Sequence, residues 1–490
     1  MTYRTPGVYV QEISVFPPSV AEVETAIPAF IGFTEFARKD GVDITTPLQI
    51  TSLKEYEQYF GEAFKEPVTA FTITVNEKQD AAGNATGFEL SHQAAATLSK
   101  YRLYYAMQMF FANGGGKCYV VSAGIYGATI DEPKLTAALN KIRLLDEPTM
   151  LVIPEAVSLS SVGDYLTVCG NAIDQAHDMK DRFAILDLKL NDPTDNEYDD
   201  NDVLDFRGDG TPAHPGLSAD AEALRYAAVY YPYLKTTFNY AVDNKDNLVV
   251  TTVLVNGAAP VPAHPPHITA GATIGSLKTT NNVAYNALLG EVNGKLKVML
   301  PPSSAMAGIY ARVDTTRGVW KAPANVAVSN VVGPSVIIDN DRQGGLNIDT
   351  TGGKSINVIR SFAGRGTIVW GGRTLDGNSN EWRYINVRRF FNMVEESVQK
   401  SSVWAVFEPN TKNTWVMVQS MIENYLVNKW KEGALAGAKP EDAFYVKVGL
   451  GVTMTADDIL NGIMNVEIGM AVARPAEFIV LKFSHKMQVS

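Results

Sequence analysis

The sequence has few of the residues that stabilise proteins covalently or bind metals. Its 490 residues include two cysteines, Cys118 and Cys169, and six histidines. Two cysteines can form neither a framework of several disulfides nor a four-cysteine zinc site, so we expect folding in a reducing compartment. The histidines show neither HExxH nor any other spacing typical of a zinc site. We therefore predict no metal and no cofactor.

Long hydrophobic runs are also missing. No apolar segment approaches the roughly 18–20 residues needed to cross a bilayer, and the first residues, MTYRTPGVYV, lack a basic segment followed by an apolar one. We expect no direct membrane insertion and assembly in the cytoplasm of the producing cell. The net charge of -11 repels polyanions, so we predict no nucleic-acid partner.

Motifs for catalysis are incomplete or absent. GGKS at 352–355 resembles the end of a phosphate-binding P-loop, but Ile348 stands where that motif needs glycine. No G-x-S-x-G nucleophile elbow is present. The acidic segment 190–210 lacks the glycine that an EF-hand needs at its sixth position, although loose divalent binding there stays open. We predict no catalytic residue and no enzyme activity.

Ordered secondary structure is strongly indicated, because 46% of the residues are hydrophobic. Short apolar segments alternate with amphipathic ones from 117 to 235, which predicts a parallel sheet covered by helices on both faces. From about residue 361 the pattern changes to α+β. The main elements expected outside the α/β stretch are strands at 26–37 and 443–450 and helices at 101–111, 303–318, 381–404 and 411–435.

Each end of the chain carries an isolated strand pattern. Residues 7–13 alternate in polarity, and Pro6 and Pro17-Pro18 separate them from any local hairpin partner. A second such pattern covers 475–484. A strand without a nearby mate must pair elsewhere in the fold or with another chain, so we predict pairing between subunits. The residues predicted to pair are Val8, Tyr9, Val10, Phe478, Ile479, Val480 and Leu481.

Several long blocks resemble the contractile tail sheath proteins of phage tails and phage-tail-like contractile injection systems. They occur in the order found in that family. The blocks include PGVYVQEIS (6–14), FFANGGGKCYVV (110–121), LPPSSAMAGIYARVDTTRGVWKAPAN (300–325), VWAVFEPNTKNTW (403–415) and PAEFIVLKF (475–483).

The resemblance implies a multidomain α/β and α+β fold. It consists of a central α/β domain with β-rich surface insertions, a C-terminal α+β sheath domain, and extended strand arms at both termini. The N-terminal linker arm is expected at 1–27 and the C-terminal strand arm at 475–490. The middle domain is expected at 28–360, with insertions near 61–99, 189–216 and 236–297. The inner, tube-facing domain is expected at 361–474.

The resemblance also implies a function and partners. The chain would be a structural subunit that polymerises with itself as stacked six-membered rings around an inner tube protein, in a metastable extended state. Contraction would drive the tube into a target envelope, with baseplate and terminal cap proteins as further partners. The particle would be a virion tail or a tail-like particle, the latter released from the cell.

Lys429 and Lys431 lie in the last turn of the helix expected at 411–432. They are predicted to contact acidic groups of the inner tube, the alternative being that they complement the helix dipole on a solvated face. Two other classes of function stay open at this stage. One is an α/β enzyme of unknown reaction, and the other is a non-contractile shell or capsid protein.

Overall fold

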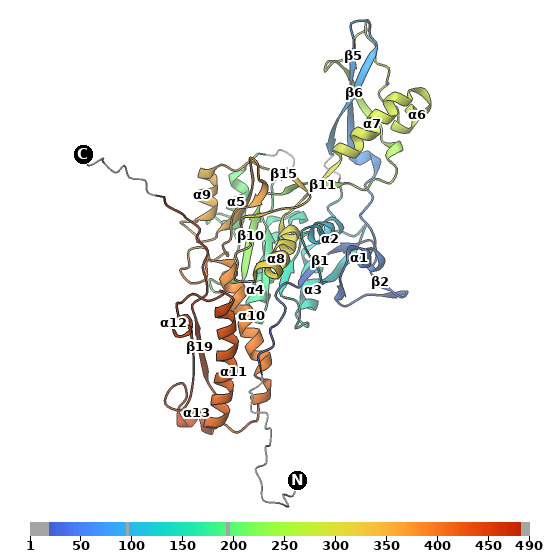
Figure 1. Ribbon diagram of the computed structural model, residues 1–490. Coiled ribbons are helices and arrows are strands. Elements are labelled where there is room, and N and C mark those ends of the chain that lie inside the picture. The colour runs from blue at the N-terminus through green and yellow to red at the C-terminus, as the bar shows by residue number, and fades with distance from the viewer. Residues whose placement is uncertain (1–18, 95–97, 193–196, 482–490) are drawn as a thin grey trace, which may run out of the picture. The chain divides into compact units, whose positions relative to one another are not determined.

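The computed structural model describes residues 19–94, 98–192 and 197–481 (Figure 1). The chain divides into a larger compact unit, Glu24–Arg389, and a smaller one made of Phe390–Ser490 with Met1–Val23. The predicted start of the C-terminal domain at 361 lies within β16 (Ile356–Phe362), a strand of the larger unit. The two compact units meet at residues 389 and 390 of the chain, and the expected domain boundaries stay a prediction.

A mixed sheet runs through the larger unit. Its central neighbours, from β7 to β16, are parallel as predicted, whereas β4, β17 and β14 add antiparallel strands at the two edges. Within the described residues the strand order is β14 (Val326–Ala327), β17 (Gly366–Val369), β16 (Ile356–Phe362), β10 (Ala227–Tyr231), β9 (Phe183–Asp187), β8 (Met150–Val152), β1 (Pro28–Thr34), β7 (Cys118–Ile125) and β4 (Leu48–Ile50).

Helices cover both faces of this sheet. Alternate residues of β1 point to opposite sides, so Ile31 and Phe33 join one apolar cluster and Phe30 joins the other. The first cluster includes residues of α3 (Glu132–Ile142), α4 (Val162–Met179), α5 (Asp200–Arg207) and α9 (Asn340–Asn347). The second includes residues of α1 (Leu53–Phe60), α2 (Leu103–Ala112) and α8 (Ser303–Arg317).

Local signals placed most of these helices correctly. Ser161 caps α4 by accepting a hydrogen bond from the Asp164 N–H, and α8 starts directly after Pro301-Pro302. The sequence pattern also predicts a helix from 219 that runs into a strand, and this helix is wrong: only a 3-10 turn, Ala223–Tyr226, precedes β10. The whole of β10 is buried between β9 and β16, and this pairing keeps the backbone extended.

The acidic segment expected as an irregular loop contains α5 (Asp200–Arg207). Asp199 caps this helix by accepting from the Asn201 N–H, and Val203 and Phe206 are buried. Two apolar anchors and a cap are therefore enough to form a short helix in a strongly acidic segment.

Two segments read separately in the sequence form one lobe. Strand β12 of the insertion at 236–297 pairs in parallel with β5 of the insertion at 61–99. The lobe has its own apolar cluster, distinct from those of the central sheet. Its main elements are β5 (Phe71–Gln79), β6 (Ala85–Ala94), β12 (Val250–Val255), α6 (Leu277–Thr280) and α7 (Asn282–Lys295) (Figure 1).

Short elements complete the larger unit. They are β2 (Arg38–Lys39), β3 (Val42–Asp43), β11 (Leu234–Asn239), β13 (Lys297–Leu300), β15 (Val331–Pro334) and 3-10 turns at Val68–Ala70, Ala156–Ser158, Lys245–Asn247 and Ile274–Ser276.

The smaller unit combines two long helices with a pair of strands. Helix α10 begins in the last residues of the larger unit and continues into the smaller one. The predictions of helices at 381–404 and 411–435 and of a strand at 443–450 are confirmed. The elements are α10 (Ile385–Ser401), a 3-10 turn (Val403–Ala405), α11 (Lys412–Lys431), α12 (Pro440–Ala443), β18 (Phe444–Val448), α13 (Ala456–Leu460) and β19 (Val466–Met470).

The separate core of the lobe yields a prediction about local stability. Leu288 lies on α7 and is fully buried in the lobe's apolar cluster, so Leu288→Ala should cost about 2–5 kcal/mol. Hydrogen exchange should become faster in β5, β6 and β12 while β1 and β9 stay protected. Val283→Ala, at a 75% exposed position of the same helix, is the control. Equal loss of protection in both sheets would contradict an independent lobe.

Candidate assembly surfaces

The buried carboxylate of Glu155 lies at the carboxyl ends of β1 and β8. Glu155 accepts hydrogen bonds from the backbone N–H groups of Phe33 (2.7 Å), Arg102 (2.7 Å) and Leu103 (3.1 Å). It thereby caps the start of α2. A side chain at Gly32 would meet Glu155 Oε2 at 3.0 Å, so glycine allows this close approach. Open α/β sheets bind ligands at such a position, and here the protein's own carboxylate occupies it.

Asp187 plays the same part at the end of β9. It accepts from the N–H of Ser303 (2.6 Å) and from the Ser303 hydroxyl (2.5 Å) at the start of α8. Burial raises the pKa of Asp187 to about 7, and burial likewise raises the pKa of Glu155 to about 7, although hydrogen bonds to both carboxyls act in the opposite direction. Both groups are explained by helix capping.

The GGKS segment is tied into the structure through its lysine. The Lys354 ammonium donates to the carbonyl oxygens of Arg207 (3.1 Å) and Leu217 (2.7 Å). The Lys354 N–H donates to Asp349, and Arg207 lies 3.6 Å from the same carboxylate. This lysine therefore holds the end of α5 against the turn that contains it.

Within the ranges 19–94, 98–192 and 197–481, no three acidic, histidine or cysteine side chains gather closely enough to hold a metal ion. Likewise, none of the helices in these ranges combines the length and apolar character needed to cross a bilayer.

The β18–β19 pair is a sheet with two open edges. Among the described residues each of these strands pairs only with the other. The N–H of Ala471 donates to Ala443, so backbone groups alternate from that point and those of Val466, Ile468 and Met470 face away from β18. These outward groups can pair with an additional strand.

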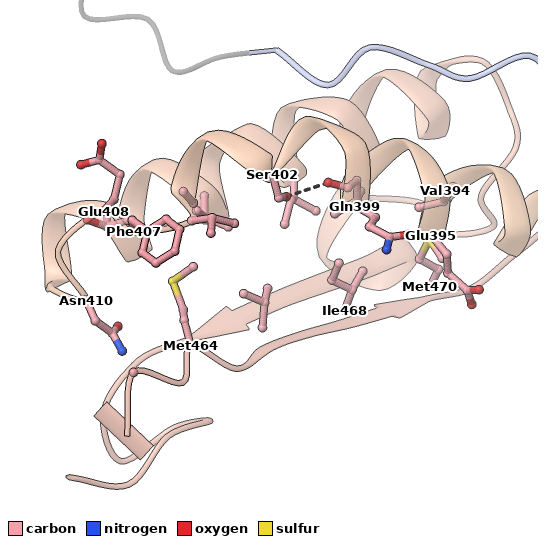
Figure 2. A pocket seen from close by; sticks show the side chains of 18 of the residues that line it. Val394, Glu395, Gln399, Ser402, Phe407, Glu408, Asn410, Met464, Ile468 and Met470 are labelled. Carbon is pink, nitrogen blue, oxygen red and sulfur yellow. Dashed lines mark hydrogen bonds between the residues drawn. The ribbon is translucent and has the colours of Figure 1, made fainter. Parts of the chain in front are cut away.

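An apolar groove of about 1020 Å³ lies beside β19 (Figure 2). Helix α10 forms one side and β19 the other, and α11 contributes to its lining. Polar side chains such as Glu395, Gln399 and Asn410 stand among the apolar ones. The apolar lining includes Val394 and Val398 of α10, Val418 and Ile422 of α11, and Val466, Ile468 and Met470 of β19.

The predicted pairing residues at the C-terminus are exposed. Phe478, Ile479, Val480 and Leu481 are 68–77% exposed, and no strand is assigned to them within this single chain. The strand expected at 475–484 is thus not formed by pairing inside the subunit over the described residues. Val8, Tyr9 and Val10 lie outside the described residues. Pairing of either arm with another subunit stays a prediction.

The two lysines of α11 occupy different environments. Lys429 is 5% exposed and forms ion pairs with Glu22 and with Glu432 (2.8 Å). Burial lowers the pKa of Lys429, but hydrogen bonds to both carboxylates outweigh it and raise the pKa above its ordinary value. Lys431 is exposed. The prediction of a tube contact is not tested for either residue, and only Lys431 presents an accessible side chain.

An open sheet edge beside an apolar groove is typical of a chain that associates with other chains. Comparison with known proteins gives the particular family. Residues 378–486 match the phage tail sheath C-terminal domain. The tail sheath protein of Vibrio phage KVP40 is 27% identical over 129 residues, which are 26% of this chain and 19% of that protein. The matched region thus spans less than a fifth of this curated relative.

Two solved structures match almost the whole chain. The helical sheath of the anti-feeding prophage in its contracted state is 29% identical, with a TM-score of 0.62 and coverage of 99% of this chain and 100% of the other. The sheath complex of an extracellular contractile injection system, PVC, also contracted, is 28% identical, with a TM-score of 0.59 and 99% of each chain covered. Part of this chain thus matches a tail sheath domain, its solved neighbours are contractile sheath assemblies, and the expected resemblance to contractile tail sheath proteins is confirmed.

The shifted carboxyl of Asp187 predicts a pH dependence. Its pKa rises from 3.8 to about 7 on folding, so the folded state binds this proton more tightly and stability falls as pH rises from about 4 to 7. Asp187→Asn should remove that contribution. In thermal unfolding of the single chain between pH 5 and 8, the variant should therefore lose less stability than the wild type. Asp341→Asn, at an exposed position, is the control. A stability difference between wild type and Asp187→Asn that does not change with pH would refute the raised pKa of Asp187.

Proposed function

We propose that this chain is the structural subunit of a contractile sheath. It polymerises as stacked six-membered rings around an inner tube, is held in a metastable extended state, and contracts to drive the tube into a target envelope. The observation that carries the proposal is the open-edged β18–β19 pair in a chain whose C-terminal strand pattern is exposed. The likeness to sheath chains over 99% of the sequence supports it.

Strand addition would connect the subunits. The β18–β19 pair offers two edges, and the sequence offers two arms, so one arm from each of two neighbours could complete the sheet. Backbone hydrogen bonds supply the attraction and side-chain pockets supply the register. The groove beside β19 would receive the inward-facing apolar side chains of the added strand.

Contraction would draw on energy stored during assembly. The sequence lacks a complete nucleotide-binding motif, and GGKS is used as a structural turn. A lattice with two alternative packings can be trapped in the less stable one and released by a trigger. Flexible arms would let subunits turn and slide while their strand pairs stay intact. Solved sheaths similar to this chain are described in the contracted state.

The proposed partners follow from the same model of assembly. They are other copies of this chain, an inner tube protein, and baseplate and terminal cap proteins. A baseplate of the anti-feeding prophage contains a chain that is 29% identical to this one, with a TM-score of 0.61. The particle would assemble in the cytoplasm and end as a virion tail or a released tail-like particle. We propose no catalytic role for the chain.

Proline substitution tests strand addition. Val480→Pro removes a backbone donor and fixes φ, and Val480 is 77% exposed in the single chain. We expect normal folding of the subunit, seen as an unchanged melting temperature, and at least a tenfold loss of tubes in negative-stain micrographs of chain expressed with its genomic neighbours. Val10→Pro should act in the same way on the other arm.

Val480→Ala is the matched control because it shortens the side chain but keeps the N–H. It should form tubes. Tubes of normal length and number from Val480→Pro would contradict strand addition at this position, and closed spheres from the wild type would favour a shell protein.

Charge reversal tests the contact with the tube. Lys431→Glu should yield sheaths that form without a tube or contract early, because an acidic partner would repel the new carboxylate. Lys412→Glu, at an exposed position near the other end of α11, serves as the control. The readout is the fraction of tube-filled sheaths in micrographs, and normal filling by Lys431→Glu would refute the assignment. Reversal at Lys429 also breaks ion pairs inside the subunit and is a less specific test.

A further inference from the structure

Residues 21–23, which were predicted as part of the N-terminal arm, are hydrogen-bonded within the smaller unit. The N–H groups of Ala21 and Val23 donate to the hydroxyl oxygens of Ser401 and Ser397, each at 3.1 Å. The acceptors are four residues apart, one turn of α10, and the donors are two residues apart, as in an extended strand. The segment therefore runs antiparallel along α10, and lower-numbered residues lie toward the helix's C-terminal end.

The residue between these two donors reaches the second long helix. Glu22 forms an ion pair with Lys429, whose ammonium also contacts Glu432 at 2.8 Å and lies 5.8 Å from the ring centre of Tyr425. The Lys429 side chain is 7% exposed, whereas the Glu22 side chain is 40% exposed, so the pair is shielded from solvent on the lysine side only. Hydrogen bonds to charged groups are among the stronger ones in proteins.

Residues 24–27 are held by the larger unit in turn. Glu24 pairs with Lys117 at 2.7 Å. Thr25 donates to Asp314 (2.7 Å) and its carbonyl accepts from Arg389 (2.9 Å). The N–H of Ile27 donates to the Thr149 hydroxyl at 2.9 Å. Side chains therefore fix the backbone at Ala21, Val23, Thr25 and Ile27.

We propose that Glu22, Lys429, Ser397 and Ser401 form a clamp that sets where the free N-terminal arm begins. This inference rests on the proposed function, because it concerns the arm that would pair with a neighbour. The clamp moves the end of the predicted arm from residue 27 to about residue 20, which shortens its extended reach by about 23 Å. It also directs the arm toward the C-terminal end of α10, whose following residues line the groove beside β19. Lys429 is then a positioning residue for assembly within the subunit.

Hydrogen exchange on the full-length single chain tests the clamp directly. Glu22→Gln removes the carboxylate charge without changing any residue of α10 or α11. Lys429→Met removes the ammonium group and keeps the apolar part of the side chain. In both variants the amides of Ala21 and Val23 should exchange about tenfold faster or more. Lys431→Met is the matched control on the same helical turn and should leave both amides unchanged. The charge swap Glu22→Lys with Lys429→Glu should restore protection that each single reversal removes.

Two outcomes of this measurement would overturn the clamp. One is unchanged protection in Glu22→Gln with an unchanged melting temperature. The other is equal acceleration in Lys429→Met and Lys431→Met. Glu22→Gln keeps the test valid even if Lys429→Met unfolds the smaller unit, because Glu22 lies outside its helices and strands.

Micrographs of assembled material then test the consequence for the arm. If Glu22→Gln releases residues 21–23 from the clamp, its tubes should show a broader distribution of subunit spacing than those of the wild type or Lys431→Met. A wild-type distribution of subunit spacing in Glu22→Gln tubes, in a variant whose Ala21 and Val23 amides exchange faster, would overturn the positioning role of Lys429. If the wild type forms no tubes at all, the proposed function fails, while hydrogen exchange still decides whether the clamp exists.

Discussion

The strand pairing of this protein depends on one constraint: backbone N–H and C=O groups need hydrogen-bond partners. In the larger unit, over the described residues, seven of the nine strands of the main sheet have a neighbour on each side, and β14 and β4 are its edges. In the smaller unit, within the described residues, β18 and β19 pair only with each other, so each strand has one open edge. This two-stranded sheet is where association with other chains has a physical cause.

Buried and half-buried ionisable side chains in this protein stabilise chain geometry. Glu155 and Asp187 bind the starts of α2 and α8, Lys354 holds the carbonyls at the end of α5, and Lys429 holds Glu22. Each satisfies otherwise unpaired groups, as buried ions must. Positions where an α/β enzyme would bind a ligand are thereby filled by side chains of the fold.

Elements with strong local signals were predicted well from the sequence. The apolar run of β1, the Ser161 cap of α4 and the proline entry to α8 depend only on neighbouring residues. Predictions failed where distant contacts override local preference. Residues 219–226 have helical propensity, yet the pairing of β10 ends the helix after one 3-10 turn. The lobe was read as two insertions because parallel pairing of β5 with β12 joins segments nearly 180 residues apart.

The sequence by itself determined the resemblance to contractile tail sheath proteins, the order of most helices and strands, and the presence of strand patterns near both ends, since these depend on composition, periodicity and motifs along the chain. Only the tertiary structure decided that Lys429 is buried against Glu22 while Lys431 is exposed, and that an apolar groove borders the open edge of β19. Two lysines two residues apart lie on different faces of a helix, and their environments are set by what packs there. That packing comes from segments about 400 residues away, which no local pattern encodes.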